Sequence, residues 1–361
     1  YKSKFHIPIV AITGSSGKTT TKDMIASVLT RRFSVLKTEG NFNNAIGLPL
    51  TLLKLQYNHQ IAVLEMGMSS LGEIRLLSDI ARPDIGVISN VGLTHIEKLG
   101  SRENILKAKL EIFSYFNSDS TAVINGDNDM LHDFSDHRFR VIKYGLKEDN
   151  EIFAYNIKEK GESGIEFSVD LDGVRTNFRV LLPGIHNVYN ALSAIAVARL
   201  FGMDAVEIQK GLNDFKPSEM RMEIIDLDSG IKVINDVYNA NPESMKAAID
   251  VLHTIKSEGR GICILGDMLE LGELSSEEHY KIGAYAASAG IDAIIAVGEF
   301  AENIKMGTTA SGMNSNVLIF SDAKSAAPFI DNVVKPGDTV LIKGSRGMKM
   351  EYIVEYLRER G

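Results

Sequence analysis

Residues 14–20 read Gly-Ser-Ser-Gly-Lys-Thr-Thr and closely follow a short apolar run at residues 7–12. This order predicts a strand, a glycine-bounded loop and the start of a helix, with Lys18 and Thr19 at the helix entrance. Such a loop turns its backbone N–H groups towards an anion, and the helix N-terminus adds partial positive charge. We expect Lys18 to reach the outer phosphates of a nucleotide and the Thr19 hydroxyl to ligate Mg²⁺.

This loop is shorter than the general phosphate-binding pattern G-x-x-x-x-G-K-[ST], because Ile12 stands where that pattern has its first glycine. A glycine turn that carries a Lys-Thr pair by chance is the alternative. The apolar residues Met24, Ile25, Val28 and Leu29 follow at helical spacing, which favours the nucleotide loop.

Three further side chains could take part in the same chemistry. Glu65 directly follows the apolar run 61–64, and His95 follows the next such run. Ligands bind at the carboxyl ends of strands in open α/β sheets, so both should line the same crevice as the loop. Glu65 could hold Mg²⁺ there, although an acid at a strand end is also a common solvated cap. Lys109, taken alone, indicates only a basic helix face.

Apolar strand-like runs alternate with helical patterns along most of the chain, which predicts α/β domains with mostly parallel sheets. Residues 151–182 differ, because polar and apolar residues alternate on both sides of Asp172-Gly173 and so predict an antiparallel hairpin. A helix is expected at residues 187–201. Lys216-Pro217-Ser218 marks the expected domain boundary.

The predicted fold is therefore an α/β ATPase-type domain with a phosphate loop and a mostly parallel sheet at residues 1–217, followed by a doubly wound, Rossmann-like domain at residues 218–361. In the second domain the patterns predict strands at 231–234, 262–265, 293–297, 317–320 and 339–342, and helices at 244–252, 277–289 and 348–358.

Composition narrows the class of protein. The 361 residues are 44% hydrophobic and 24% charged, which is typical of globular domains. A net charge of −8 argues against broad binding to nucleic acid, and a single cysteine excludes a disulfide within the chain. No apolar run approaches the roughly 20 residues that span a bilayer, and no signal peptide opens the chain. We expect a cytoplasmic monomer that does not insert into membranes.

Taken together, these motifs resemble the Mur ligases, the ATP-dependent amide-bond ligases of peptidoglycan assembly. Within that family the MurF type is the most similar. The resemblance covers essentially all 361 residues. The strings that carry it lie at residues 13–20, 65–67, 94–97 and 108–113 for the family, and at 38–49, 184–191, 235–242, 265–272 and 343–347 for the MurF type.

The resemblance implies how ATP is held. Asn187 would contact the adenine, and Arg221 and Asp236 from the second domain would reach the phosphates and the ribose when the domains close. The residues that would hold the phosphates are Gly14, Ser15, Ser16, Gly17, Lys18, Thr19 and Thr20.

The same resemblance implies two magnesium ions. Thr19 and Glu65 would ligate the first, and His95 would help to bind the second. Lys109 matches a lysine that family members carry as a carbamate. That modification would turn a cation into an anion able to bind the second Mg²⁺.

The implied reaction joins D-Ala-D-Ala to UDP-MurNAc-tripeptide through an acyl phosphate, with release of ADP and phosphate. Asn43 and Asn44 would face the peptide substrate. Ser345 and Arg346 would bind the carboxylate of the incoming dipeptide, because an arginine fork suits that group. The alternative within the family is a ligase that joins an amine to a different carboxylate without UDP.

Full MurF-type ligases carry an N-terminal UDP-binding domain, and nothing before Tyr1 supplies it. We therefore expect a fragment of a full ligase that retains ATP binding but has weak affinity for the UDP-sugar peptide; a natural two-domain relative is the alternative. Two other classes fit less well. A regulatory switch that reads guanine would carry an Asn-Lys-x-Asp motif, and the sequence has none. An oxidoreductase that binds a dinucleotide would carry G-x-G-x-x-G after a strand, and this motif is also absent from the sequence.

Overall fold

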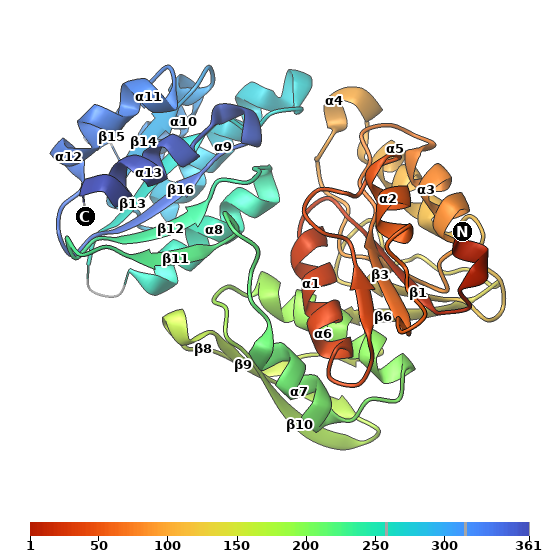
Figure 1. The fold of residues 1–361 in the computed structure, drawn as a ribbon. Coiled ribbons are helices and arrows are strands. Elements are labelled where there is room, and N and C mark those ends of the chain that lie inside the picture. Colours follow the sequence, from red (N-terminus) through yellow and green to blue (C-terminus); the bar gives the residue numbers. More distant parts are fainter. Residues whose placement is uncertain (257–258, 314–315, 361) are drawn as a thin grey trace. The chain divides into compact units, whose positions relative to one another are not determined.

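The structure, a computed structural model, describes residues 1–256, 259–313 and 316–360. The chain separates into two compact units, unit 1 at Tyr1–Lys216 and unit 2 at Pro217–Gly361 (Figure 1). Each unit contains its own mainly parallel sheet. Among the described residues, no helix has the length and apolar character needed to cross a membrane.

Unit 1 is built on a seven-stranded sheet with the order β2-β3-β1-β4-β5-β6-β7, in which all neighbouring strands are parallel. Because β3, β1 and β4 are adjacent, the segments that follow these three strands emerge side by side at the carboxyl edge. The strands are β1 (Ile9–Thr13), β2 (Val35–Lys37), β3 (Ile61–Glu65), β4 (Ile85–Ile88), β5 (Thr121–Asn125), β6 (Arg140–Gly145) and β7 (Ile152–Phe153).

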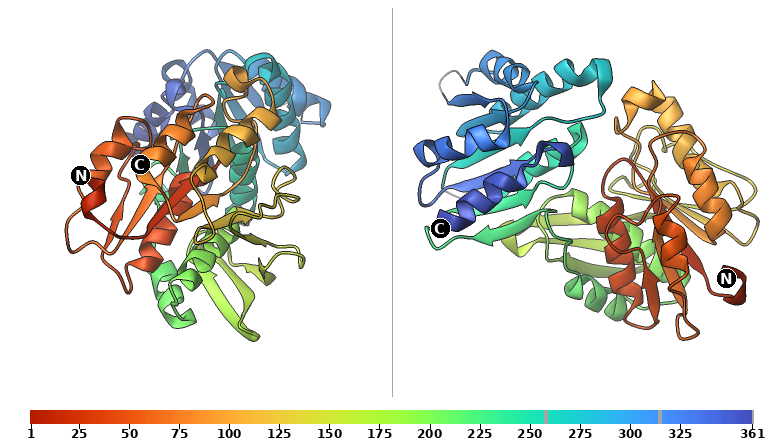
Figure 2. Two further views of the ribbon diagram at one scale, coloured as in Figure 1. Left: turned by 90° about the vertical axis from the view of Figure 1, so that its right-hand side faces the viewer. Right: turned by 45° about the horizontal axis from the view of Figure 1, so that its top comes forward.

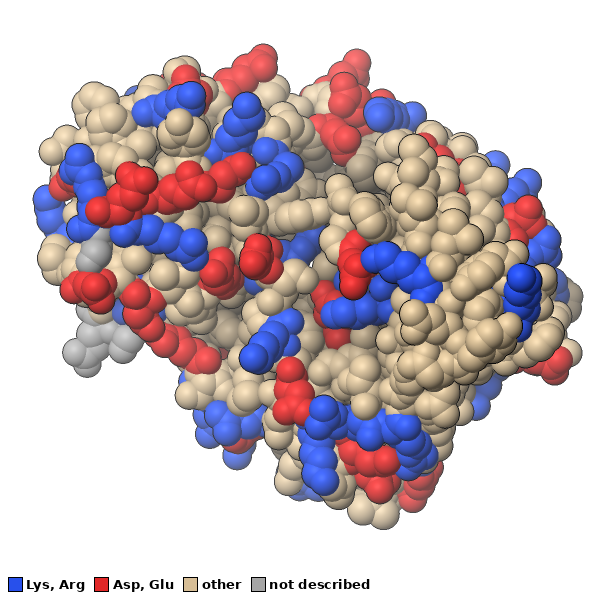
Figure 3. Space-filling model, in the orientation of Figure 1, with Lys and Arg blue, Asp and Glu red and all other residues tan. Residues whose placement is uncertain are grey.

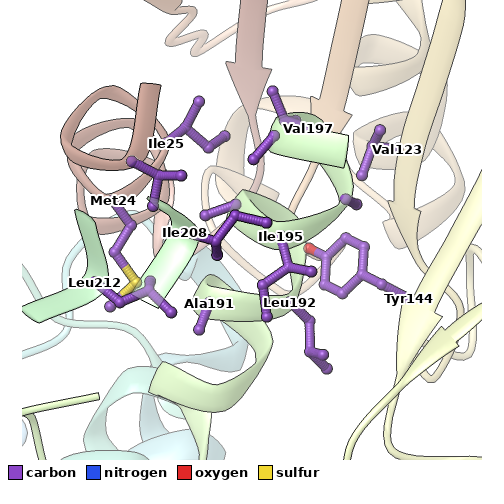
Figure 4. Close-up of a cluster of buried hydrophobic side chains, with 14 of the residues drawn as sticks. Met24, Ile25, Val123, Tyr144, Ala191, Leu192, Ile195, Val197, Ile208 and Leu212 are labelled. Carbon is purple, nitrogen blue, oxygen red and sulfur yellow. The ribbon is translucent and has the colours of Figure 1, made fainter. Parts of the chain in front are cut away.

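Helices cover both faces of this sheet (Figures 1 and 2). On one face α1, α6 and α7 pack together, and Figure 4 shows Met24 next to Leu212, with Ile208 and Ile195 further along the same buried cluster. The helices of unit 1 are α1 (Lys18–Leu29), α2 (Gly47–Leu52), α3 (Glu73–Ala81), α4 (Ile96–Leu99), α5 (Arg102–Leu110), α6 (His186–Leu200) and α7 (Ala205–Asp214).

A separate three-stranded antiparallel sheet, β10-β9-β8, interrupts the parallel pattern where the alternating sequence predicted a hairpin. Its strands are β8 (Tyr155–Glu159), β9 (Ile165–Leu171) and β10 (Val174–Val180). Asp172 and Gly173 both have positive φ angles, 52° and 78°, as a two-residue type I′ turn requires. β10 begins at Val174, directly after this turn, and pairs there with Leu171.

Unit 2 contains a six-stranded sheet with the order β11-β12-β16-β13-β14-β15. All neighbours are parallel except β11, an antiparallel edge strand that the sequence patterns did not predict. The strands are β11 (Glu223–Asp226), β12 (Lys232–Asp236), β13 (Gly261–Gly266), β14 (Ala293–Val297), β15 (Val317–Phe320) and β16 (Thr339–Lys343). The helices are α8 (Pro242–Ile255), α9 (Ser275–Ser288), α10 (Ala301–Ala310), α11 (Ala323–Ala326), α12 (Ile330–Val333) and α13 (Glu351–Arg360).

The last helix was predicted wrongly at its start. The apolar pattern indicated a helix from residue 348, but α13 begins only at Glu351. Lys349 has a φ angle of 53°, in the left-handed region, and ends a short 3-10 turn at Arg346–Met348. A left-handed residue breaks the helical path, so the turn and α13 are separate elements.

Acidic and basic side chains are interspersed on the face of the molecule drawn in Figure 3, on both units. This mixture is in keeping with the modest net charge of −8.

Candidate active site

The loop between β1 and α1 lies at the carboxyl edge of the sheet in unit 1, as its sequence predicted. Gly17 precedes the first residue of α1 and has a φ angle of 75°, a conformation that a residue with a side chain rarely adopts. Lys18 begins the helix, and its Nζ donates to the carbonyl oxygen of Gly14 at 2.9 Å. Thr19 is buried in the first turn, while Thr20 is half-buried.

The segment that follows β4 braces this loop. Asn90 Oδ1 accepts hydrogen bonds from the backbone N–H groups of Ser15 and Ser16, at 3.0 and 2.9 Å. The Asn90 amide also donates to Ser16 Oγ, at 2.6 Å. Ser89 Oγ lies so near the loop that a Cβ added to Gly14 would meet it at 1.9 Å. Ser89 and Asn90 were not predicted as site residues, since their role depends on a contact between distant segments.

The start of α6 supports the loop from another direction. Asn190 Oδ1 accepts from Thr21 Oγ1 at 3.0 Å and would lie 3.1 Å from a Cβ added to Gly17. The Asn190 amide donates to Asn187 Oδ1, and the Asn187 amide donates to the carbonyl oxygen of Pro183. The structure therefore connects Asn187, predicted to contact adenine, to the phosphate loop through Asn190.

Glu65 ends β3 and is almost fully buried, with 2% of its surface exposed. Its Oε1 accepts from the Asn43 amide at 2.8 Å. Its Oε2 is buried and has no hydrogen-bond partner among the described residues. A buried carboxylate oxygen without a donor is costly unless a cation or another donor reaches it, so Glu65 fits the predicted magnesium ligand.

Lys109 is the most unusual cation in unit 1. It lies near the end of α5, is only 1% exposed, and forms no hydrogen bond or ion pair through its Nζ within the described part of the chain. Burial lowers the pKa of its ammonium group well below the usual value, and the positive charge of Lys18 lowers it further. The buried site therefore disfavours the charged ammonium relative to the neutral amine, which is the nucleophilic form.

His95 lies in the segment that connects β4 to α5. The preceding residue, Thr94, donates from Oγ1 to the carbonyl oxygen of Ser15, which brings this segment to the phosphate loop. His95 itself has a φ angle of 65°, which is uncommon for a residue other than glycine and often marks a functional position.

The two asparagines predicted to face a substrate behave differently. Asn43 is half-buried and contacts Glu65, so it lies beside the candidate metal ligand. Asn44 is exposed, and its Oδ1 accepts from the N–H groups of Ile46 and Gly47 at the start of α2. The Asn44 side chain thus caps a helix, and a substrate contact by this residue stays a prediction.

In unit 2, Asp236 ends β12 beside Lys343 at the end of the neighbouring strand β16. Lys343 is buried, and its Nζ contacts Asp236 Oδ2 at 2.5 Å and the carbonyl oxygen of Asn239 at 2.9 Å. The Arg221 guanidinium lies 4.0 Å from the centre of the Tyr238 ring. The roles of Asp236 and Arg221 towards a nucleotide stay predictions.

Ser345 and Arg346 follow β16 and have unlike surroundings. Ser345 is buried, and its Oγ accepts from the Leu269 N–H at 2.9 Å. Arg346 is exposed and pairs with Glu351 at 3.3 Å. Ser345 therefore joins two loops of unit 2, and recognition of a dipeptide carboxylate by this pair stays a prediction.

Among the described residues, no cluster of three or more histidine, cysteine, aspartate or glutamate side chains could enclose a metal ion. Mg²⁺ does not require such a cluster, because it is commonly held by one or two protein ligands, water and the phosphates of a nucleotide. Glu65 and Thr19 at the carboxyl edge of unit 1 suit that mode of binding.

Comparison with known families identifies the class of protein. The family model described as the Mur ligase middle domain matches residues 12–198. This chain belongs to the Mur ligase family. A second family model, described as the Mur ligase glutamate ligase domain, matches residues 220–346 of this Mur ligase. The first match contains the phosphate loop, Glu65, His95 and Lys109.

Individual relatives agree with this assignment. The UDP-N-acetylmuramoyl-tripeptide–D-alanyl-D-alanine ligase of Bacillus subtilis is 41% identical to this Mur ligase over 359 residues, which cover 99% of this chain and 78% of the relative. MurF from Acinetobacter baumannii has a TM-score of 0.91 at 33% identity, covering 99% of this chain and 78% of that chain. MurF from Thermotoga maritima, solved in complex with ADP, has a TM-score of 0.86 at 29% identity, covering 99% and 81%. The resemblance and the fold class predicted from the sequence are confirmed.

The brace described above can be tested in this Mur ligase by replacing Asn90 with alanine. The substitution removes the side-chain acceptor of the Ser16 N–H and one of the two acceptors of the Ser15 N–H, which keeps its bond to the Asn90 carbonyl oxygen at 3.1 Å. Each hydrogen bond lost is worth about 1 kcal/mol. We expect the affinity for ATP, measured by calorimetry, to fall about tenfold or more. Asn117→Ala is a suitable control, because Asn117 Oδ1 accepts from Asp119 N in a surface turn of the same unit. Equal affinities of the two variants for ATP would contradict the role of Asn90.

Proposed function

We propose that this Mur ligase joins D-Ala-D-Ala to UDP-MurNAc-tripeptide and couples the new amide bond to cleavage of ATP into ADP and phosphate. The observation that carries the substrate assignment is the 41% identity, over 99% of the chain, to the Bacillus subtilis ligase of that name. The use of ATP is supported by the phosphate loop and by the MurF relative solved with ADP. Because ATP is consumed, we place the reaction in the cytoplasm.

The chemistry takes two steps. A carboxylate oxygen of the tripeptide attacks the γ-phosphorus of ATP, the bond to the ADP oxygen breaks, and an acyl phosphate forms. The amine of the dipeptide then attacks the acyl carbon, phosphate leaves, and the nitrogen loses a proton. Two anions must meet in the first step, so positive charge near the phosphates is required. We assign this charge in unit 1 to Lys18 and to the N-terminal end of α1, which begins at Lys18.

Magnesium, when bound, would neutralise the phosphate charge and hold the reacting oxygens in line. We assign its ligands to Thr19 and Glu65, because Glu65 has a buried carboxylate oxygen without a partner. His95 and a modified Lys109 would serve a second ion. These assignments rest on the donor types and on the burial of the two charged side chains.

We further propose that Lys109 reacts with carbon dioxide. Its neutral nitrogen would attack the carbon of CO₂, form an N–C bond and lose a proton, which leaves an N-carboxylate. The burial of Lys109, its lack of an acidic partner among the described residues, and the proximity of the Lys18 charge support this step. The product would pair with Lys18 and offer oxygen ligands to a cation.

The experiment that tests the proposed reaction measures phosphate release by the chain supplied with ATP, Mg²⁺, D-Ala-D-Ala and UDP-MurNAc-tripeptide. We expect release only when both peptide substrates are present, together with a product whose mass is that of the tripeptide extended by the dipeptide. The tripeptide concentration is varied widely, so weak binding shows as a high KM. Phosphate release without the amine would contradict the ligase assignment. A product formed only with a carboxylate that lacks UDP would overturn the substrate assignment.

A further inference from the structure

Lys22 is a buried cation of unit 1 that has no role in the reaction proposed above. It lies on α1, the helix that begins with Lys18 and Thr19, and its side chain is 3% exposed. Its Nζ donates to the carbonyl oxygen of Thr38 at 2.8 Å and pairs with Asp23 at 3.0 Å. A buried ion pair adds little to the stability of a fold, because the cost of removing two charges from water offsets most of the energy of their attraction.

Thr38 connects this lysine to the candidate metal ligand. It follows the edge strand β2 and is fully buried, and its N–H continues the ladder by donating to the Val63 carbonyl oxygen at 3.0 Å. Its Oγ1 accepts from the backbone N–H of Glu65 at 3.0 Å. The Thr38 hydroxyl thus ends the pairing between β2 and β3 at Glu65, whose Oε2 has no hydrogen-bond partner among the described residues.

The segment after Thr38 also fixes the Glu65 side chain. Asn43 donates to Glu65 Oε1, and the Asn43 carbonyl oxygen accepts from the Gly67 N–H at 2.8 Å. A Cβ added to Gly67 would lie 3.0 Å from the Asn43 side chain, so the two segments are in close contact. Residues 38–43 therefore hold Glu65 at its backbone through Thr38 and at its carboxylate through Asn43.

Resting on the proposed function, we infer that Lys22 is a positioning residue that fixes the spacing between Thr19 and Glu65, the two side chains assigned to one magnesium ion. Thr19 and Lys22 belong to the same rigid helix. Through Thr38, Lys22 ties that helix to the end of β3. Mg²⁺ demands a nearly ideal octahedral geometry, so a small change in this spacing weakens its binding.

Asp23 completes the anchor and supplies a matched control. Burial alone would raise the pKa of the Asp23 carboxyl, but Lys22 and Lys37 hold it below its usual value. Lys37 pairs with Asp23 Oδ1 at 2.7 Å, although its own side chain is 47% exposed. Replacing Lys37 removes one positive charge beside Asp23 but leaves the hydrogen bond from Lys22 to the Thr38 carbonyl oxygen in place. Replacing Lys22 removes a positive charge beside Asp23 and also this hydrogen bond.

The first experiment needs no ligand. Hydrogen–deuterium exchange is compared for the wild-type chain, Lys22→Met and Lys37→Met. In Lys22→Met we expect the peptide covering residues 38–43 and the Glu65 amide to exchange at least tenfold faster. The peptides of α1 should keep their protection, which excludes general unfolding. In Lys37→Met both regions should behave as in the wild type.

The second experiment measures binding of Mn²⁺, a spectroscopic substitute for Mg²⁺, to the chain saturated with ADP. We expect Lys22→Met and Thr38→Val each to weaken binding about 10-fold or more, as changes to residues behind metal ligands do. The double variant, Lys22→Met with Thr38→Val, should bind Mn²⁺ about as weakly as the single variant with the lower affinity. The reason is that both substitutions break the same connection, which runs from Lys22 through Thr38 to Glu65. Valine has nearly the same volume as threonine, so Thr38→Val still tests the proposal if Lys22→Met fails to fold.

The outcomes separate the two proposals. If the wild-type chain with ADP does not bind Mn²⁺, the magnesium site of the proposed function fails. If the wild type binds Mn²⁺ and both Lys22→Met and Thr38→Val bind it as tightly as Lys37→Met, the positioning role of Lys22 is overturned.

Discussion

Replacing Lys109 with methionine should slow amide-bond formation by orders of magnitude and, at the same time, stabilise the folded chain. The buried amine has no hydrogen-bond or ion-pair partner among the described residues, and methionine fills a similar volume without a polar group. Burial of an unpaired polar group costs about 1–3 kcal/mol, so the free energy of unfolding at pH 7, measured without bicarbonate so that Lys109 is an unmodified amine, should rise by roughly that amount. Loss of the proposed carbamate should lower the rate of ligation about 10²–10³-fold, as removal of a group that stabilises transition-state charge does.

The gain in stability should depend on pH in a defined direction. The pKa of Lys109 is lowered in the folded chain, whereas in the unfolded chain it takes the usual value of about 10.4. Between these two values the unfolded chain binds more protons, so the stability of the wild type rises with pH. The variant lacks this titration. The difference between the two proteins should therefore be larger at neutral pH than in alkaline solution and shrink towards pH ~10, which urea unfolding at several pH values measures.

The neighbouring lysine of the same helix gives the control. Lys107 is exposed on α5, so Lys107→Met should change neither the stability nor the rate of ligation. Incubation with ¹³C-bicarbonate provides a readout apart from activity. A carbamate carbon signal should appear in the wild type and in Lys107→Met and be absent from Lys109→Met. If Lys109→Met catalyses ligation at the wild-type rate, Lys109 has no role in the reaction.

The sequence could predict the parts of the site whose signals are local. The loop at residues 14–20 lies between an apolar run and a helical pattern, and Glu65 ends a buried run, so both positions follow from strand ends in a parallel sheet. The burial of Lys109 also left a local signal. Ile105 and Ala108 are buried on the same helix, and Lys109 lies one turn after Ile105 on that face.

Other parts of the site depend on contacts between distant segments and leave no such signal. Asn90 braces Ser15, and Lys22 reaches Thr38 across the gap between a helix and an edge strand. The sequence around each of them is compatible with an ordinary exposed polar residue. Asn190 is intermediate, because it lies three residues after Asn187 on α6, within a motif already noted, and helical spacing places both on one side.

Glu65→Gln should separate nucleotide binding from the chemistry that needs magnesium. Glutamine has nearly the same shape, so its oxygen can keep the contact with the Asn43 amide. The buried Oε2, which has no partner among the described residues, becomes an NH₂ group that donates hydrogen bonds and cannot ligate a cation. We expect ADP binding without metal to persist, Mn²⁺ binding to be lost, and phosphate release to fall about 10²–10³-fold.

A second acid near the same strand tests whether this effect belongs to Glu65 alone. Glu73 lies at the start of α3, and its carboxylate accepts from the Ser69 N–H at 2.8 Å and from the Ser70 hydroxyl at 2.7 Å. Because its oxygens are satisfied by the protein, Glu73→Gln should leave Mn²⁺ binding and phosphate release near the wild-type values. If Glu65→Gln binds Mn²⁺ as tightly as Glu73→Gln does, the open oxygen of Glu65 is not a metal ligand. In that case the repulsion between carboxylate and phosphate must be offset by Lys18 and the loop amides.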